Sequence, residues 1–78
     1  MEIKANDYSP NDILKYMRQN TGLTQQQFAQ SIGKSEDWCQ SNELGRSNYY
    51  FKDLLELAKN NGMDIIIKES DKKRTINK

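Results

Sequence analysis

The chain has 78 residues, with one cysteine, no histidine, and 12 Lys/Arg against 11 Asp/Glu. This length allows one small domain with a thin core. A lone cysteine excludes an internal disulfide, and without histidine the chain lacks the residues for a zinc site or a His-assisted nucleophile. We therefore expect no enzyme activity, metal or cofactor. No apolar run approaches the roughly 18–20 residues of a membrane span. We therefore expect a cytoplasmic protein without a membrane partner.

The basic residues are concentrated near the C-terminus. Residues 1–63 carry seven Lys/Arg against eight Asp/Glu, and residues 64–78 carry five against three. Specific DNA-binding proteins usually have a basic face that neutralises phosphate, so this distribution does not favour DNA. The Lys72-Lys73-Arg74 cluster is typical of a solvated tail, or it could add non-specific affinity for DNA.

The N-terminal third predicts an arm followed by a helix. Residues 1–8 have little periodicity and are expected to be extended. Ser9 and Pro10 are an N-cap and a first helical residue, and the helix should run to about Asn20 before Thr21-Gly22 ends it. Its apolar face is Ile13, Leu14 and Met17.

The middle of the chain predicts two short helices joined by a turn at Gly33. Thr24 and Gln27 fit a capping box, and Ser35 caps the next helix, Glu36 to about Leu44, which Gly45 ends. The first of the two has an apolar face of Phe28, Ala29 and Ile32. Cys39 is expected to be a small buried residue.

The last third predicts a helix and then a strand. Ser47 or Asn48 opens a helix at about 49–60, and Asn60-Asn61-Gly62 ends it. Its face is Tyr50 or Phe51 with Leu54, Leu57 and Ala58. The β-branched run that follows predicts a short strand at 64–69, and 70–78 is expected to be a flexible basic tail.

These helices resemble the Cro/repressor-type, or xenobiotic-response-element-like, helix-turn-helix family. The resemblance covers Pro10 to Met63 and is carried by Leu23-Thr24-Gln25, Phe28-Ala29, Ile32-Gly33, Ser35 and Glu43-Leu44-Gly45. It implies a mainly α fold: a four- to five-helix lambda-repressor-like helix-turn-helix domain over 9–63 with a short C-terminal β-strand.

Two stretches are similar, less extensively, to the DNA-binding antitoxin of the HipA-kinase module. They are Tyr8-Ser9-Pro10 and the β-rich stretch from Met63 to Glu69. In that antitoxin the terminal strand pairs across a two-fold axis. The resemblance therefore implies a homodimer formed through Ile65, Ile66 and Ile67. The alternative is that this stretch packs over the helices of its own domain.

The family also implies a structural pair, Arg18 with Glu43, in which a bidentate Arg–carboxylate bond locks the reading helix to the scaffold. The chain departs from the family at Lys34, Asn42 and Asn61, where apolar residues are usual, and at Cys39, where a larger aliphatic is usual. Trp38 is more apolar than expected at its position. It either turns inward to replace lost volume or forms an exposed contact with a partner.

Carried over to this sequence, the family's contacts fall into two sets. The phosphate-contacting residues would be Thr24, Gln25, Lys34, Arg46 and Asn48. The base-reading residues would be Glu36, Asp37, Gln40 and Ser41. Glu36 and Asp37 can only accept hydrogen bonds, so cytosine N4 is their target. Alternatively, the two acids serve only the dipole of their helix.

The sequence thus leads to two hypotheses. The first is a transcriptional repressor or autorepressor, phage- or mobile-element-like, that binds a palindromic operator in double-stranded DNA as a homodimer. The second is a helix-turn-helix scaffold that binds a protein, such as a toxin or a target enzyme. It would then act as an antitoxin, an antirepressor or an inhibitor of a nucleic-acid enzyme.

Overall fold

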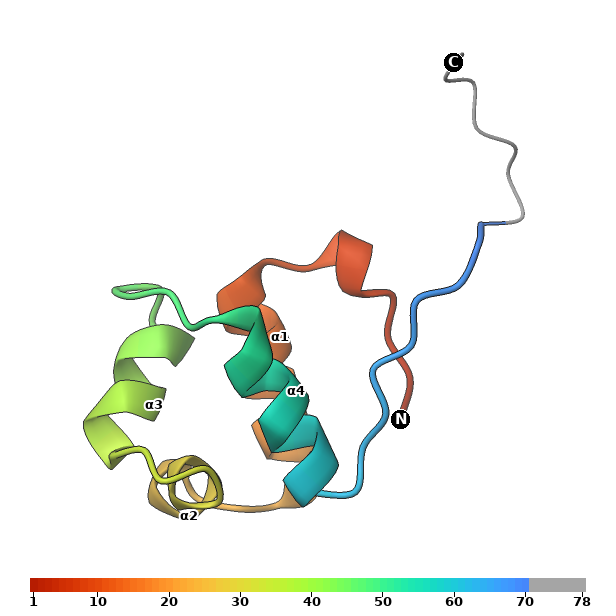
Figure 1. Cartoon of the computed structure of the whole chain (residues 1–78). Helices are drawn as coiled ribbons and strands as arrows, with labels where there is room; N and C mark the ends of the chain where they lie inside the picture. Colours follow the sequence, from red (N-terminus) through yellow and green to blue (C-terminus); the bar gives the residue numbers. More distant parts are fainter. Residues whose placement is uncertain (71–78) are drawn as a thin grey trace.

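The computed structural model describes residues 1–70, which form a small, mainly helical domain (Figure 1). The helices are η1, a 3₁₀ helix at Ala5–Asp7, and the α-helices α1 (Pro10–Thr21), α2 (Gln25–Gln30), α3 (Glu36–Glu43) and α4 (Phe51–Asn60). The predicted mainly α class is confirmed. Within the described part, no helix is long and apolar enough to cross a membrane.

Three helices begin at the predicted hydroxyl caps. The side-chain oxygens of Ser9, Thr24 and Ser35 accept backbone N–H bonds three residues on, at 3.3, 3.1 and 3.1 Å. The Gln27 side chain also accepts the Thr24 N–H at 3.1 Å, which completes the capping box. Each cap satisfies a backbone donor that the first helical turn leaves free, and is worth about 1 kcal/mol.

The turn between α2 and α3 depends on Gly33. This residue has φ 72°, in the left-handed region, and the next N–H, of Lys34, donates to the carbonyl of Ala29 at 3.0 Å. An L side chain in this conformation costs about 1–2 kcal/mol. Glycine therefore allows the chain to turn within the five residues between α2 and α3, so that α3 packs directly against α2.

The start of α4 differs from the prediction. It begins at Phe51 rather than about Tyr49, because Tyr50 is extended at φ −84°, ψ 149°. The Tyr49 hydroxyl donates to the Pro10 carbonyl at 2.6 Å, which ties this residue to the start of α1. The Asp53 carboxylate then accepts the N–H of Tyr50 at 3.3 Å. Tyr50 and Phe51 are exposed, so the expected apolar face begins only at Leu54.

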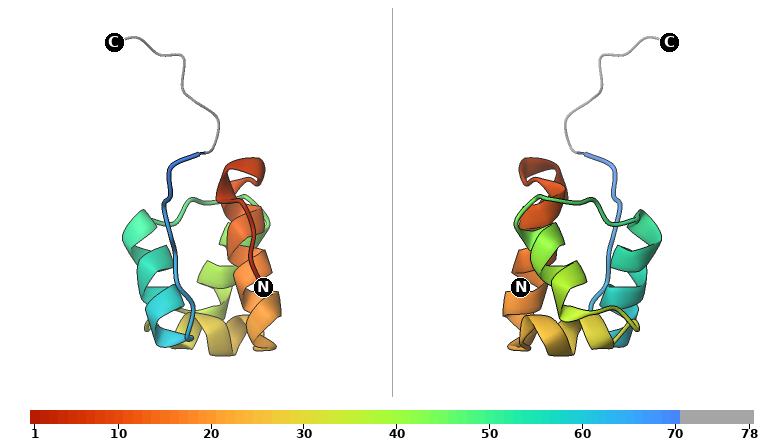
Figure 2. Two further views of the ribbon diagram at one scale, coloured as in Figure 1. Left: turned by 90° about the vertical axis from the view of Figure 1, so that its right-hand side faces the viewer. Right: turned by 90° about the vertical axis from the view of Figure 1, so that its left-hand side faces the viewer.

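The four α-helices enclose one core. α1 and α4 run in the same direction, and α2 crosses near their C-terminal ends. From α2 the chain runs back in α3 toward the other end of the domain (Figure 2). The predicted apolar faces of the first two helices supply much of the core, with Ile13 and Ile32 half-buried at its edge. The buried apolar side chains are Leu14, Met17, Phe28, Ala29, Cys39, Leu54, Leu57 and Ala58.

The two ends of the described chain also differ from expectation. Residues 1–8 include the 3₁₀ turn η1 and are not extended throughout. Residues 63–70, here called the C-terminal segment, form no strand with any other described residue. The segment turns back along α4, and its Met63 N–H donates to the Ala58 carbonyl at 2.8 Å (Figure 1). The rest of the predicted tail, 71–78, lies outside the described residues.

Candidate functional site

The carboxylate of Glu43, at the end of α3, lies in contact with Arg18 of α1. Arg18 Nε donates to Oε2 at 2.6 Å and Nη2 donates to Oε1 at 3.1 Å, which is the two-pronged geometry expected for this pair. The remaining guanidinium nitrogen, Nη1, donates to the Leu23 carbonyl at 3.1 Å, just before α2. Arg18 therefore fixes both the end of α3 and the entry to α2.

Two further side chains donate to the same carboxylate. Gln25 Nε2, at the start of α2, lies 3.1 Å from Oε1, and the Cys39 thiol lies 3.3 Å from Oε2. We call Arg18, Gln25, Cys39 and Glu43 the Glu43 network. Its members come from α1, α2 and α3, so one carboxylate holds three helices at a fixed relative orientation.

The ionisation of the network follows from its geometry. Burial opposes the charge on Glu43, but hydrogen bonds from Arg18, Gln25 and Cys39 outweigh burial and hold its pKa below the ordinary value. The hydrogen bond to Glu43 is also the main reason that the pKa of Arg18 is raised. Burial, together with the adjacent carboxylate, raises the pKa of the Cys39 thiol to about 12. Cys39 is fully buried, as predicted, and its thiol is protonated at neutral pH.

The α3 face, defined by Glu36, Asp37 and Gln40, points away from the core. All three side chains are exposed, whereas Ser41, the fourth predicted base-reading residue, is half-buried. The residues of the face lie one helical turn apart or less, so they are neighbours on the surface. The structure brings three of the four predicted base-reading residues together.

The predicted phosphate-contacting residues fall into two groups. Arg46 and Asn48 are exposed in the loop after α3. The other three already have internal interactions: the Thr24 hydroxyl caps α2, Gln25 belongs to the Glu43 network, and the half-buried Lys34 holds its Nζ 5.8 Å from the centre of the Trp38 ring. That separation is within cation–π range.

Two residues of α3 that depart from the family both turn inward. Trp38 is half-buried and packs against the core, which agrees with the volume-filling alternative. Asn42 is 1% exposed and its Nδ2 donates to the Trp38 carbonyl at 2.8 Å. Its Oδ1 is buried without a hydrogen-bond partner within residues 1–70. A buried acceptor left unpaired destabilises the fold.

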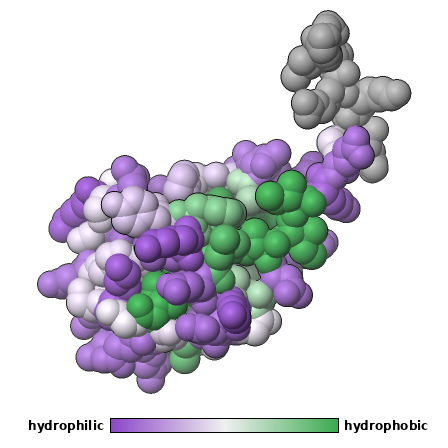
Figure 3. Space-filling model, viewed as in Figure 1, coloured by the Kyte–Doolittle hydropathy of each residue, from purple (hydrophilic) through white to green (hydrophobic). Residues whose placement is uncertain are grey.

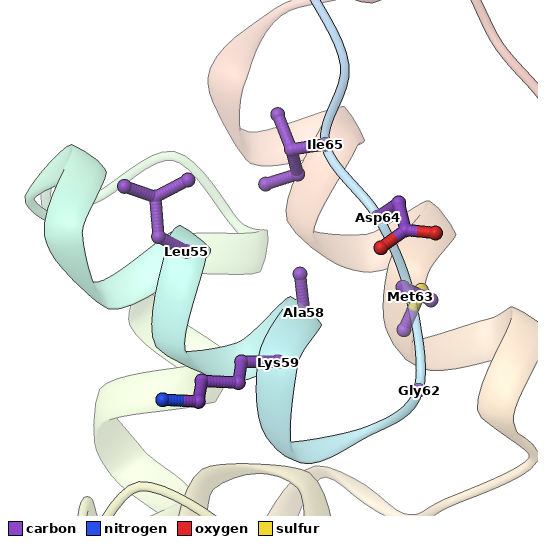
Figure 4. Close-up of a pocket in the computed structure, with 7 residues that line it drawn as sticks. All are labelled: Leu55, Ala58, Lys59, Gly62, Met63, Asp64 and Ile65. Carbon is purple, nitrogen blue, oxygen red and sulfur yellow. The ribbon is translucent and has the colours of Figure 1, made fainter.

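The opposite side of the molecule carries an apolar surface. It is formed by the outward residues Phe51 and Leu55 of α4 together with Ile65, Ile66 and Ile67 of the C-terminal segment. Figure 3 shows apolar residues gathered on this side. Beneath them lies an open hollow of about 410 Å³, where Leu55 and Ala58 from α4 face Ile65 from the segment (Figure 4).

Two features of these surfaces were missed at the sequence level. One is the bond from Gln25 to Glu43, which joins residues 18 positions apart and has no local signal. The other is the exposed pair Phe51 and Leu55. The helical period favours Phe51, or Tyr50, on the core face and leaves Leu55 unassigned, because a buried stripe and an exposed stripe have the same period.

Comparisons with protein-family models, with curated proteins and with solved structures gave no match to this chain.

Proposed function

We propose that this protein is a helix-turn-helix regulator that binds double-stranded operator DNA as a homodimer and represses transcription. One observation carries the proposal. The Glu43 network holds α3 rigidly against α1 and α2, while the α3 face projects into solvent. A helix that reads base edges in the major groove needs both a fixed orientation and free polar side chains.

The surroundings of the α3 face supply two exposed groups for the DNA backbone. Arg46 and Asn48 follow α3 in the loop before α4, and neither is buried. An arginine and an amide at this place can hold phosphate oxygens without reading sequence. The bond that Gln25 makes to Glu43 favours a positioning role for its side chain, so we assign phosphate contact mainly to the loop.

The C-terminal segment supports the homodimer through its charge pattern. In antiparallel self-pairing centred on Ile66, Asp64 lies opposite Lys68 of the second copy, and Ile65 lies opposite Ile67. Each charge thus meets its opposite, and four isoleucines from the two chains share one face. Ile66 and Ile67 are 72% and 90% exposed in the single chain, so pairing would remove a large apolar area from water.

The DNA proposal is tested by selection from a random duplex library, followed by titration of the selected and of random DNA at several salt concentrations. We expect a specificity ratio of about a thousand or more and a clear salt slope. Arg46→Ala should weaken binding to all sequences alike, while Lys59→Ala, on α4, serves as the matched control. Equal weak binding to selected and random DNA would rule out the regulator.

The dimer is tested by charge exchange and by cross-linking. Asp64→Lys and Lys68→Asp should each weaken association in sedimentation equilibrium, and the double variant should restore it. In a Cys39→Ala background, Ile66→Cys should form an intermolecular disulfide on mild oxidation, because directly opposed residues lie within reach of each other. Ser47→Cys is the exposed control. A monomer at all concentrations, or equal cross-linking at 47 and 66, would refute this pairing.

The second candidate function is protein binding by the same scaffold, as an antitoxin, an antirepressor or an inhibitor. The α3 face favours it, since two of its three residues are acidic and would repel a polyanion. The exposed Leu44 at the end of α3 adds an apolar contact. If the selection enriches no DNA sequence, affinity capture with Glu36→Lys/Asp37→Lys as the negative control becomes the deciding experiment.

A further inference from the structure

The C-terminal end of α4 carries the sequence Asn61-Gly62, the single Asn-Gly pair in the chain. Asparagine followed by glycine is chemically labile, because glycine has no side chain to block approach of its backbone nitrogen to the asparagine side-chain carbonyl. We propose that Asn61 is a site of spontaneous deamidation whose rate is controlled by opening of the last turn of α4. This modification site is independent of the DNA-binding proposal.

The reaction needs only water. The backbone nitrogen of Gly62 attacks Cγ of Asn61, an N–C bond forms, the Cγ–Nδ2 bond breaks, and ammonia leaves with the proton from the backbone nitrogen. The resulting five-membered succinimide is then opened by water at either carbonyl. Opening yields aspartate in the normal chain, or isoaspartate, in which the chain continues through the side-chain carbon. No oxidation or reduction takes place.

The folded structure restrains this reaction by holding the amide. Asn61 Nδ2 donates to the Leu57 carbonyl at 2.8 Å and to the Ser31 hydroxyl at 3.1 Å. The Ser31 hydroxyl in turn donates to the Phe28 carbonyl at 2.7 Å, which anchors the acceptor to the end of α2. Ring closure must turn the side chain toward Gly62 and so break both hydrogen bonds that the Asn61 amide donates. It therefore proceeds from a locally opened state.

The product would alter the joint between α2 and α4, by which we mean the hydrogen bonds from Asn60 and Asn61 to Ser31. A carboxylate at residue 61 cannot donate to Leu57 or Ser31, and its negative charge lies at the negative end of the α4 dipole. Isoaspartate also lengthens the backbone just before Gly62, where φ is 72° and the Met63 N–H closes on Ala58. The C-terminal segment leaves the domain at this point, so conversion would shift its placement along α4.

The test is incubation of the full chain at mildly alkaline pH, followed by peptide mapping that separates Asn, Asp and isoAsp. Asn61 should convert measurably faster than Asn48, an exposed asparagine followed by tyrosine that serves as the internal control. Ser31→Ala should speed conversion about fivefold, the effect of one net hydrogen bond on the opening equilibrium. Ser47→Ala is the matched control and should leave the rate unchanged.

Circular dichroism establishes that Ser31→Ala is folded. If that variant unfolds, Asn60→Ala replaces it, because Asn60 Nδ2 donates to the Ser31 carbonyl at 2.7 Å and its loss should also loosen the joint. Converted protein, separated by anion exchange, should melt at a lower temperature than unconverted protein. The proposal is overturned if Asn61 converts no faster than Asn48, or if loosening the joint leaves the Asn61 rate unchanged.

Discussion

The two sides of this molecule are organised in opposite ways. On the α3 side, most buried polar groups are paired, and apart from Leu44 the exposed surface is charged or polar. On the α4 side, the buried side chains are apolar except for Asp53, and large apolar side chains also remain in water. The first side is therefore held together by polar bonds within one chain, while the second leaves an apolar surface in water. The contrast separates residues that stabilise the fold from exposed apolar residues that do not.

The Glu43 network gives the largest expected effect. Arg18→Ala leaves a 4% exposed carboxylate without its charged partner, so we expect a loss of about 3 kcal/mol or more in the free energy of unfolding. Urea denaturation measures it. The exposed Arg46→Ala should change stability by no more than about 0.5 kcal/mol. Similar values for both arginines would show that the network contributes little to the fold.

Acid should weaken the stabilisation that the Glu43 network gives to the α3 side. The pKa of Glu43 is lowered in the folded state, so its stabilisation is present above the ordinary glutamate pKa, about 4.3, and is lost as pH falls through the folded value. The urea midpoint should decline below about pH 4. The Glu43→Gln variant should have a lower urea midpoint at neutral pH, and its midpoint should fall less steeply as the pH is lowered. Parallel pH profiles for the two proteins would contradict this assignment.

Asn42 is the buried polar residue of the α3 side that is not fully paired, so replacing it should raise the stability of the fold. Its Oδ1 is buried and unpaired within the described chain, so Asn42→Leu removes a desolvation penalty and adds apolar contact. We expect a gain of about 1 kcal/mol in the free energy of unfolding. Asn48→Leu, at an exposed position, is the matched control and should show no gain. A destabilised Asn42→Leu would mean that the site has no room for the larger side chain.

The α4 side gives the smallest expected effect on the fold itself. Ile66→Asp changes a 72% exposed residue, so the unfolding free energy of the monomer should stay within about 0.5 kcal/mol of the parent. Leu57→Ala, in the core of the same helix, should cost about 2–5 kcal/mol. If Ile66→Asp is as costly as Leu57→Ala, the segment belongs to the core, and the contrast between the two sides is lost.

Local patterns predicted most of the helical framework. Hydroxyl caps, a capping box and glycine stops act over three to five residues, so the starts of α1, α2 and α3 could be recognised directly. The start of α4 was placed too early because the bond from Tyr49 to Pro10, 39 positions apart, carries no local signature. The resemblance implied the Arg18–Glu43 pair, but Gln25 became a member of the network only through packing.

The sequence by itself therefore determined where α1, α2 and α3 begin, which residues cap them and that Cys39 is buried, because these depend on short-range hydrogen bonds and periodicity. The tertiary structure decided which of two similar apolar stripes faces the core. It also decided that Glu43 joins three helices, and that Ile66 and Ile67 lie in water when the chain is alone. These features depend on groups far apart in the chain. Their burial and pairing exist only once the helices have packed.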